Sequence, residues 1–176
     1  PGLSGTVTVG TGGTYPTLTD AGGLFAAINT QGLSGNLTAQ IISSITESGT
    51  NALDTMATVN CGGGGPFSLT IKPTVASTLS GSISPALIRL NGADNVTIDG
   101  SIGNTANTVC PPSSATRDLT IVNTFTNSTN NSAVIWLQTA SGDGATNNTI
   151  RNCNIVGSGN LATGTLIAVG SGSSTI

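Results

Sequence analysis

The stretch Asn95-Val-Thr-Ile98 is one copy of a phrase that recurs along this 176-residue chain and decides its fold. Polar and apolar side chains alternate in it, which is typical of a half-buried β-strand. Its copies are Ser68-Leu-Thr-Ile71, Asn95-Val-Thr-Ile98, Asp118-Leu-Thr-Ile121, Asn147-Asn-Thr-Ile150 and Ser173-Ser-Thr-Ile176. A recurrence every 23 to 29 residues indicates stacked repeats, each burying the apolar face of its neighbour. The phrase therefore predicts an all-β parallel solenoid.

A second phrase, centred on Ile and closed by Leu or Val, accompanies the first. Its copies are Ala86-Leu-Ile-Arg-Leu90, Ala133-Val-Ile-Trp-Leu137 and Thr165-Leu-Ile-Ala-Val169. The central Ile residues are 47 and then 32 positions apart, and an inserted loop at about 103–117 accounts for the difference. Two interpretations follow. Each Thr-Ile phrase marks its own coil, or Ile98 and Ile121 lie on two faces of one three-sided coil, which makes both phrases consistent.

Strand alternation in the second phrase predicts which side chains face outward. The central Ile and the closing Leu or Val point inward, so Arg89 and Trp136 stack on the outside, flanked by Leu87 and Val134. Trp and Arg are common anchors in interfaces, so these four residues form a candidate contact surface for a partner or a glycan. The alternative is that loops of the same chain cover this face.

The chain divides into a capping region over 1–35 and solenoid coils over 36–176. Within the first part, Gly5-Thr-Val-Thr-Val-Gly10 predicts a strand, and a short helix is expected from roughly Thr19 to Asn29 with Thr19 or Asp20 as N-cap. Such a helix covers the open end of a solenoid core. Because Ser173-Ser-Thr-Ile176 ends inside a repeat with no capping pattern, we expect a piece of a longer chain.

Composition excludes several classes of function. Only 6% of the residues are charged, the net charge is −3, and four residues are basic. So few cations cannot neutralise a nucleic-acid backbone, nor hold the chain on an anionic membrane surface. No apolar run approaches the length of a membrane-spanning helix, so we expect no membrane insertion.

The three cysteines and the absence of histidine indicate which disulfides and metal sites the chain can form. Cys61 precedes four glycines and Cys110 precedes two prolines, so both lie in loop-like sequence where either a Cys61–Cys110 disulfide or free thiols are expected. Cys153 lies in a strand-like segment and is expected to be a buried free thiol. Without histidine or a Cys-x-x-Cys pair, we expect no zinc site and no cofactor.

An ordered set of segments resembles the pectate-lyase-like right-handed parallel β-helix modules of large secreted bacterial surface proteins of the Bacteroidetes type. The segments are Tyr15 to Ile28, Gly32 to Thr38, Thr70 to Pro73, Ile88 to Gly100 and Asn147 to Ile155. The resemblance implies a right-handed β-helix with an N-terminal capping strand and helix, and a secreted, cell-surface location. It also implies an adhesive or structural role, and it carries over architecture better than activity.

Two further candidate sites are a pair of aspartates and a single threonine. Lyases and hydrolases occur among right-handed β-helices, and glycoside hydrolysis uses paired carboxylates. Asp99 and Asp118 are the best such pair here, although both also suit corners that bind backbone N–H groups. The triplet Asp54-Thr55-Met56 matches an O-glycosylation pattern described for Bacteroidetes, which makes Thr55 a candidate acceptor.

We therefore expect a non-catalytic structural or adhesive module of a secreted cell-surface or extracellular filament protein. Its partners would be copies of itself, neighbouring domains of the same protein, or surface glycans. The alternative is a module that binds or degrades polysaccharides.

Overall fold

A computed structural model describes residues 2–57, 65–103, 116–126, 132–158 and 165–170. Thirteen strands and one helix lie in these ranges. The strands form three sheets in which paired strands all run parallel. The prediction of a mostly-β chain with one short helix is confirmed.

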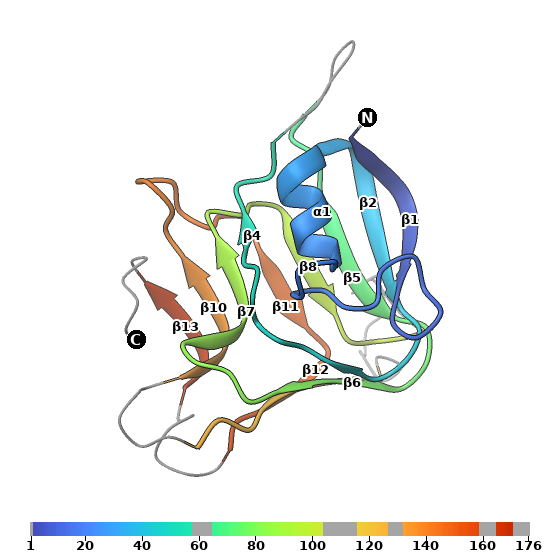
Figure 1. The fold of residues 1–176 in the computed structure, drawn as a ribbon, viewed down its shortest axis with the longest axis vertical. Helices are drawn as coiled ribbons and strands as arrows, with labels where there is room; N and C mark the ends of the chain where they lie inside the picture. The colour runs from blue at the N-terminus through green and yellow to red at the C-terminus, as the bar shows by residue number, and fades with distance from the viewer. Residues whose placement is uncertain (1, 58–64, 104–115, 127–131, 159–164, 171–176) are drawn as a thin grey trace, which may run out of the picture.

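The chain passes from sheet A to sheet B to sheet C in rotation. Sheet A contains β1 (Leu3–Val9), β2 (Leu33–Ile41), β5 (Leu69–Pro73), β8 (Val96–Asp99) and β11 (Thr149–Arg151). Sheet B contains β3 (Ile45–Thr46), β6 (Ser77–Gly81), β9 (Leu119–Asn123) and β12 (Cys153–Val156). Sheet C contains β4 (Leu53–Asp54), β7 (Ala86–Asn91), β10 (Ala133–Gln138) and β13 (Thr165–Gly170). From β2 to β13 the chain completes four such circuits. Figure 1 shows sheet C at the left, sheet B at the bottom and β1, β2 and β5 at the right.

Strand pairing decides between the two interpretations of the Thr-Ile phrase. Ile98 pairs with Ile71 and Ile150 in sheet A. Ile121, in contrast, pairs with Leu79 and Ile155 in sheet B. The two residues therefore lie on different faces of one three-sided circuit, as the second interpretation predicted. The predicted insertion falls between β8 and β9, and most of it lies outside the described residues.

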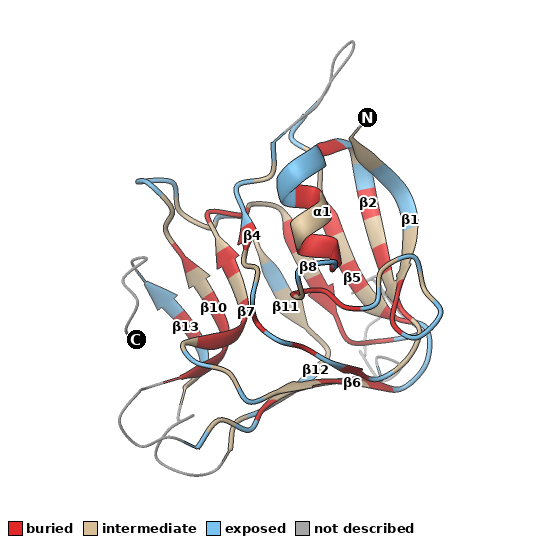
Figure 2. Ribbon diagram, viewed as in Figure 1, coloured by how far each residue is buried: buried red, intermediate tan, exposed pale blue. Residues whose placement is uncertain are grey.

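The core is a set of apolar rows that run from circuit to circuit inside the three sheets. In sheet C, Ile88 pairs with Ile135, and both side chains are fully buried. The same holds for Ile71 and Ile98 in sheet A. Because the outward positions are mainly Thr, Ser and Asn, the walls need few charges to stay hydrated. Figure 2 shows buried segments alternating with less buried ones along β2.

Asparagines form many of the corners between sheets. Asn95, Asn147 and Asn152 have φ values of 58°, 54° and 54°, in the left-handed region that Asn tolerates. Asparagine side chains also connect circuits. The Asn36 Oδ1 accepts the Ser68 N–H at 3.1 Å, and the Asn148 Oδ1 accepts the Val96 N–H at 2.8 Å. Both of these bonds join an asparagine side chain to a backbone group of a neighbouring circuit, so asparagine stabilises the stacking of circuits as well as the corners.

The helix α1 (Leu24–Gln31) lies between β1 and β2 in the sequence and covers one end of the core. Its buried residues Leu24, Phe25 and Ile28 belong to the same apolar cluster as the strand rows. Gly32 follows the helix with φ 66°, and its N–H donates to the Ile28 carbonyl oxygen, which satisfies an otherwise free acceptor. The predicted short helix is therefore present, and it covers one end of the apolar core.

The predicted start of this helix was wrong. Its N-cap is Gly23, which makes no side-chain capping bond, and not Thr19 or Asp20. The Thr19 hydroxyl is used elsewhere, because it donates to the Glu47 carboxylate at 2.6 Å. The residues just before Gly23 therefore form a loop that is hydrogen-bonded to Glu47. In the described part of the chain, no helix is long and apolar enough to cross a membrane.

Candidate functional site

The carboxylate of Asp99 sits at the corner after β8 and is fully buried. Its Oδ2 accepts hydrogen bonds from the Arg151 Nε at 3.0 Å and Nη2 at 2.9 Å, a two-point contact across neighbouring strands. Its Oδ1 accepts bonds from the Asn152 amide at 2.9 Å and the Ser101 N–H at 3.2 Å. Both oxygens are thus committed to the protein's own donors.

Asp118 lies just before β9, near the same corner, and is bound in a similar way. Its Oδ2 accepts a bond from the Ile102 N–H at 2.9 Å and another from the Thr116 hydroxyl. These donors, the Thr116 hydroxyl first, hold the pKa of the Asp118 carboxyl below its usual range. The chain therefore brings Asp99 and Asp118 to one corner, where both bind backbone N–H groups, as the structural alternative predicted. The described residues contain no cluster of three or more His, Cys, Asp or Glu that could hold a metal ion.

The pairing predicted for Arg89 and Trp136 is confirmed, but their exposure is not. Trp136 pairs with Arg89 on one side and with Ala168 on the other. Trp136 is only 3% exposed, and Leu87 and Val134 are fully buried. The expected exposed apolar surface is therefore absent from these positions.

Other parts of the chain account for this burial. Leu87 belongs to the same apolar cluster that Ile83 packs against, and Ile83 lies in the corner before β7. The Arg89 Nη2 donates to the carbonyl oxygens of Gly49 and Thr50, at 3.0 and 3.1 Å. Arg89 thus fastens one circuit to the preceding one, which is a structural use of the charge.

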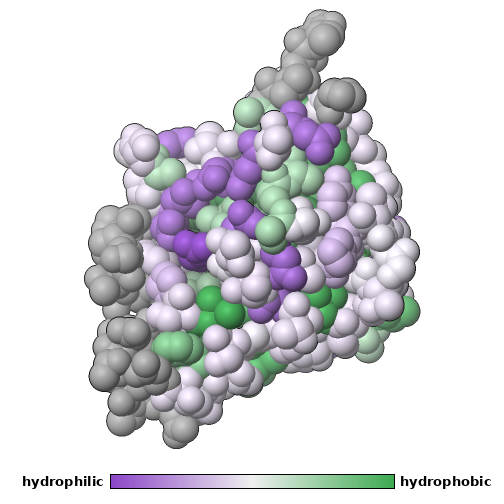
Figure 3. Space-filling model, viewed as in Figure 1, coloured by the Kyte–Doolittle hydropathy of each residue, from purple (hydrophilic) through white to green (hydrophobic). Residues whose placement is uncertain are grey.

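A polar row crosses the ends of the sheet C strands. The Asn91 amide donates to Asp54 at 2.7 Å, and the Gln138 amide donates to the Asn91 oxygen at 2.7 Å. Thr55, the candidate glycosylation residue, is exposed beside this row, and its hydroxyl donates to Asp143 at 3.2 Å. Figure 3 shows hydrophilic residues gathered on the face that carries α1 and sheet C.

A cavity of about 70 Å³ lies close to Thr55. It is lined by Leu33, Thr55, Met56, Pro66, Phe67, Asp94 and Asn95. Its lining combines apolar side chains with a carboxylate, an amide and a hydroxyl, a combination that suits a small neutral polar ligand. No sequence pattern predicts this cavity, because residues of four separate segments meet there.

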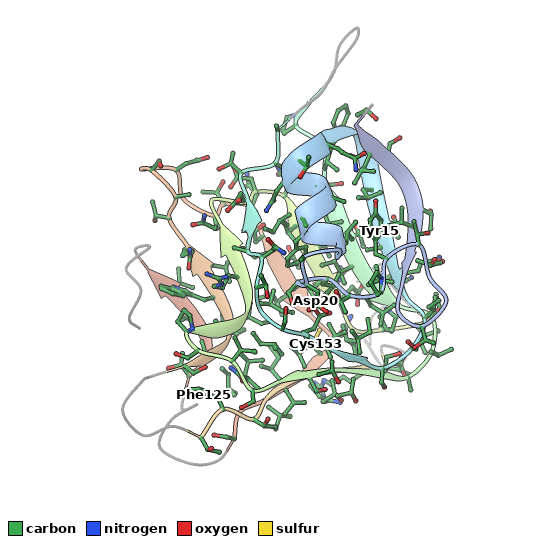
Figure 4. All side chains as sticks on the ribbon, viewed as in Figure 1. Tyr15, Asp20, Phe125 and Cys153 are labelled. Carbon is green, nitrogen blue, oxygen red and sulfur yellow. The ribbon has the colours of Figure 1, made fainter. Side chains whose placement is uncertain are left out.

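Glu47 is the main polar residue that sequence reasoning missed. It is 2% exposed, and its carboxylate accepts bonds from the N–H groups of Leu18 and Thr19 as well as from the Thr19 hydroxyl. Nearby, the Asp20 side chain accepts the Ser48 N–H at 2.9 Å; Figure 4 places Asp20 in the loop before α1. Glu47 thus holds the capping loop on the corner between β3 and β4. A single Glu in a polar stretch carries no pattern that predicts this.

The stability of the cap is expected to depend on pH through Glu47. Burial raises the pKa of this carboxyl above 4.5, although its three donors act in the opposite direction. A raised folded-state pKa contributes stability that is complete below about pH 4.5 and is lost as pH rises through the folded-state pKa. We expect the free energy of unfolding of the wild type to fall relative to that of Glu47→Gln as pH rises from about 4 to 8. A constant difference between the two would contradict the prediction.

Cys153 is a free, half-buried thiol on β12 (Figure 4), close to the buried thiol that was expected. Its Sγ lies 3.1 Å from the Arg151 carbonyl oxygen, and burial raises its pKa to about 11. Cys61 and Cys110, the predicted disulfide pair, lie outside the described residues.

Alkylation of Cys153 should therefore be slow in the folded protein. With a pKa of about 11 in place of 9.0, the thiolate fraction at pH 8 falls about 100-fold. Iodoacetamide labelling followed by peptide mapping separates Cys153 from the other two cysteines. The same peptide labelled in urea is the control, and equal rates in both states would overturn the prediction.

Comparisons with family models, with curated proteins and with solved structures find no match to this chain. Its class is therefore defined by its own geometry: a mostly-β chain wound through three parallel sheets, with a helix over one end.

Proposed function

We propose that this chain is a right-handed parallel β-helix module of a secreted cell-surface or extracellular filament protein, with a structural or adhesive role and no catalysis. The observation that carries the proposal is how the chain uses its few charges. Arg89 and the Arg151–Asp99 pair fasten one circuit to the next, and Glu47 fastens the cap. Charges bound in this way hold stacked circuits together, which suits a structural role.

The secreted location and the relation to pectate-lyase-like surface modules are part of the same proposal. Their support is the ordered set of segments from Tyr15 to Ile155 and a wall rich in Thr, Ser and Asn. Thr55 is exposed, as an acceptor of O-linked sugar would have to be.

The experiment is an assay of cleavage and binding on a panel of neutral and acidic polysaccharides, with and without calcium. We expect no turnover. Turnover that disappears in Asp118→Asn, with the circular dichroism spectrum unchanged, would sink the non-catalytic proposal. Asp118 is the informative position because it is only half-buried and pairs with no cation among the described residues, whereas replacing the fully buried Asp99 also disturbs Arg151.

A second candidate function, glycan binding without cleavage, is favoured by the cavity beside Thr55. Phe67 offers an apolar ring face for the C–H face of a sugar, while Asp94 and Asn95 offer partners for hydroxyl groups. Affinity electrophoresis should show retardation by a neutral polysaccharide that Phe67→Ala abolishes. Val75→Ala, at an exposed residue that does not line the cavity, is the matched control. Equal retardation of both variants would assign binding to another surface.

A further inference from the structure

The backbone around the cavity beside Thr55 is held in place by hydrogen bonds between separate segments. The structure describes all seven residues that line this cavity. The Leu33 N–H donates to the Ala57 carbonyl oxygen at 2.8 Å. The Leu69 N–H donates to the Asn95 carbonyl oxygen at 3.2 Å. These bonds join the four segments of the cavity in two pairs, so its shape is set by the fold, as is usual for sites that bind small molecules.

The size of the cavity selects a chemical group smaller than a sugar ring. Its volume is about 70 Å³. A cavity of about 150 Å³ accepts a benzene ring, so a cavity of half that volume takes about three or four heavy atoms. A pyranose ring therefore stays at the mouth of the cavity, and the group that enters is a substituent of the ring.

Asp94 gives the cavity an oriented hydrogen-bond acceptor. Its Oδ1 accepts a bond from the Thr146 N–H and another, at 2.7 Å, from the Thr146 hydroxyl. Its Oδ2 makes no hydrogen bond to any residue that the structure describes, which leaves this oxygen for a ligand. A carboxylate oxygen only accepts, so it favours a ligand with an N–H or O–H donor and disfavours a carboxylate or sulfate group.

The other lining residues add an apolar part and an amide. Met56 and Phe67 pack against the main core, and Leu33 is only 1% exposed. The side-chain amide of Asn95 has no partner within the described part of the chain and can donate to a ligand. A group that fits this lining has a methyl, a donor for the carboxylate and an acceptor for the amide. An acetamido group has all three and is small enough to enter.

We infer that this cavity binds the N-acetyl group of an N-acetylhexosamine residue in a surface glycan. The methyl group lies against Leu33 and Met56. The N–H donates to Asp94, the carbonyl oxygen accepts from Asn95, and the sugar ring lies at the mouth beside Phe67. An O-acetyl group lacks the N–H that Asp94 requires. This inference rests on the glycan binding proposed above and names the class of sugar that the same site takes.

The test compares two matched pairs of probes by ligand-observed saturation-transfer NMR and by titration. The pairs are the methyl glycosides of N-acetylglucosamine and glucose, and those of N-acetylgalactosamine and galactose. Within each pair the ring is the same, and the acetamido group replaces a hydroxyl. We expect at least one N-acetylated glycoside to bind at least about tenfold more tightly than its hydroxyl partner. Its acetyl methyl should receive the strongest saturation.

Asp94→Asn tests the predicted contact. Because the two Thr146 donors hold Oδ1 in place, the new amide nitrogen takes the position of Oδ2 and meets the N–H of the ligand. Binding of the N-acetylated glycoside should weaken at least about tenfold. The hydroxyl partner should be little affected, since a hydroxyl can donate or accept. Asp20→Asn removes the same charge outside the cavity and should leave the binding of both glycosides unchanged.

The outcomes separate this inference from the glycan binding on which it rests. Equal affinities within each pair, or strongest saturation at ring protons, would overturn it, as would failure of both N-acetylated glycosides to bind. Retardation by a polysaccharide would then still support glycan binding, and its absence would remove that function too. Equal weakening by Asp94→Asn and Asp20→Asn would also overturn the inference, because net charge would then explain the effect. Circular dichroism of both variants excludes unfolding as a cause.

Discussion

Replacing Glu47 with alanine is expected to lower the free energy of unfolding by about 3 kcal/mol, because buried donors lose their acceptor. The N–H groups of Leu18 and Thr19 donate to the two carboxylate oxygens at 2.9 and 2.8 Å, and both residues are fully buried. Because Leu18 and Thr19 are fully buried, alanine at position 47 would leave both N–H groups away from solvent without this acceptor. Denaturant unfolding followed by circular dichroism measures the change.

A matched control tests whether burial causes this cost. Asp20→Ala removes a carboxylate of the capping loop itself that also bonds to the β3–β4 corner, but its bond to the Ser48 N–H is exposed to solvent. Water can satisfy that N–H, so the cost should stay below about 1 kcal/mol. Similar losses for Asp20→Ala and Glu47→Ala would show that Glu47 is not the anchor of the cap.

The second large effect is expected at Gly100, where substitution by alanine should destabilise the fold by about 3 kcal/mol. A Cβ atom at Gly100 would lie 2.1 Å from the Asn152 carbonyl oxygen and 2.8 Å from its carbonyl carbon. Both are backbone atoms of the next circuit, so a side-chain rotation cannot relieve the clash. The corner between β8 and β9 would have to separate from the corner between β11 and β12.

Gly103→Ala is the control for Gly100→Ala, because a Cβ at Gly103 meets nothing within 4 Å. The two glycines lie three residues apart at the same corner. Thermal or denaturant unfolding should show almost no change for Gly103→Ala. A comparable loss for both would assign the effect to the backbone freedom of glycine and not to the contact between circuits.

The Gly100 contact and the Asp99–Arg151 pair belong to one corner, and their contacts show how the candidate catalytic pair is used. Asp99 binds Arg151 and Asn152, Gly100 touches Asn152, and the Gly100 carbonyl oxygen accepts the N–H groups of Asp118 and Leu119. The residues that most resembled a catalytic pair therefore form a joint between circuits. This use of Asp99 is the physical basis for proposing a structural role.

Much of the architecture could be predicted from the sequence, because a solenoid repeats its local environment. The spacing of Ile88, Ile135 and Ile167 predicted their register in sheet C, and the pairing agrees. The assignment of Ile98 and Ile121 to different faces followed from reconciling two phrases, and strand pairing confirms it. The two-residue alternation along a strand is enough to predict which side chains form the inward apolar rows.

Alternation along a strand predicts which side of the sheet a side chain faces, but it does not predict whether that side is exposed to solvent. The prediction of the candidate contact surface failed for this reason. Leu87 and Val134 were predicted to point outward, yet both belong to the main apolar core, and Trp136 packs in a second buried cluster. Their covering comes from corners and neighbouring strands, whose placement depends on contacts between distant segments. The start of α1 was missed for a similar reason, since Glu47 binds Thr19 from 28 residues away.

By itself, the sequence determined the strand-rich class, the helix over one end and the low charge of the walls, and it reduced the circuit to two interpretations, of which strand pairing chose the three-sided one. These properties follow from local periodicity and composition, which every circuit repeats. Only the tertiary structure decided how the rare polar residues are used: Glu47 as the anchor of the cap, Asp99 as the partner of Arg151, and Trp136 as a covered residue. Each of these depends on contacts between circuits, and such contacts leave no periodic trace along the chain.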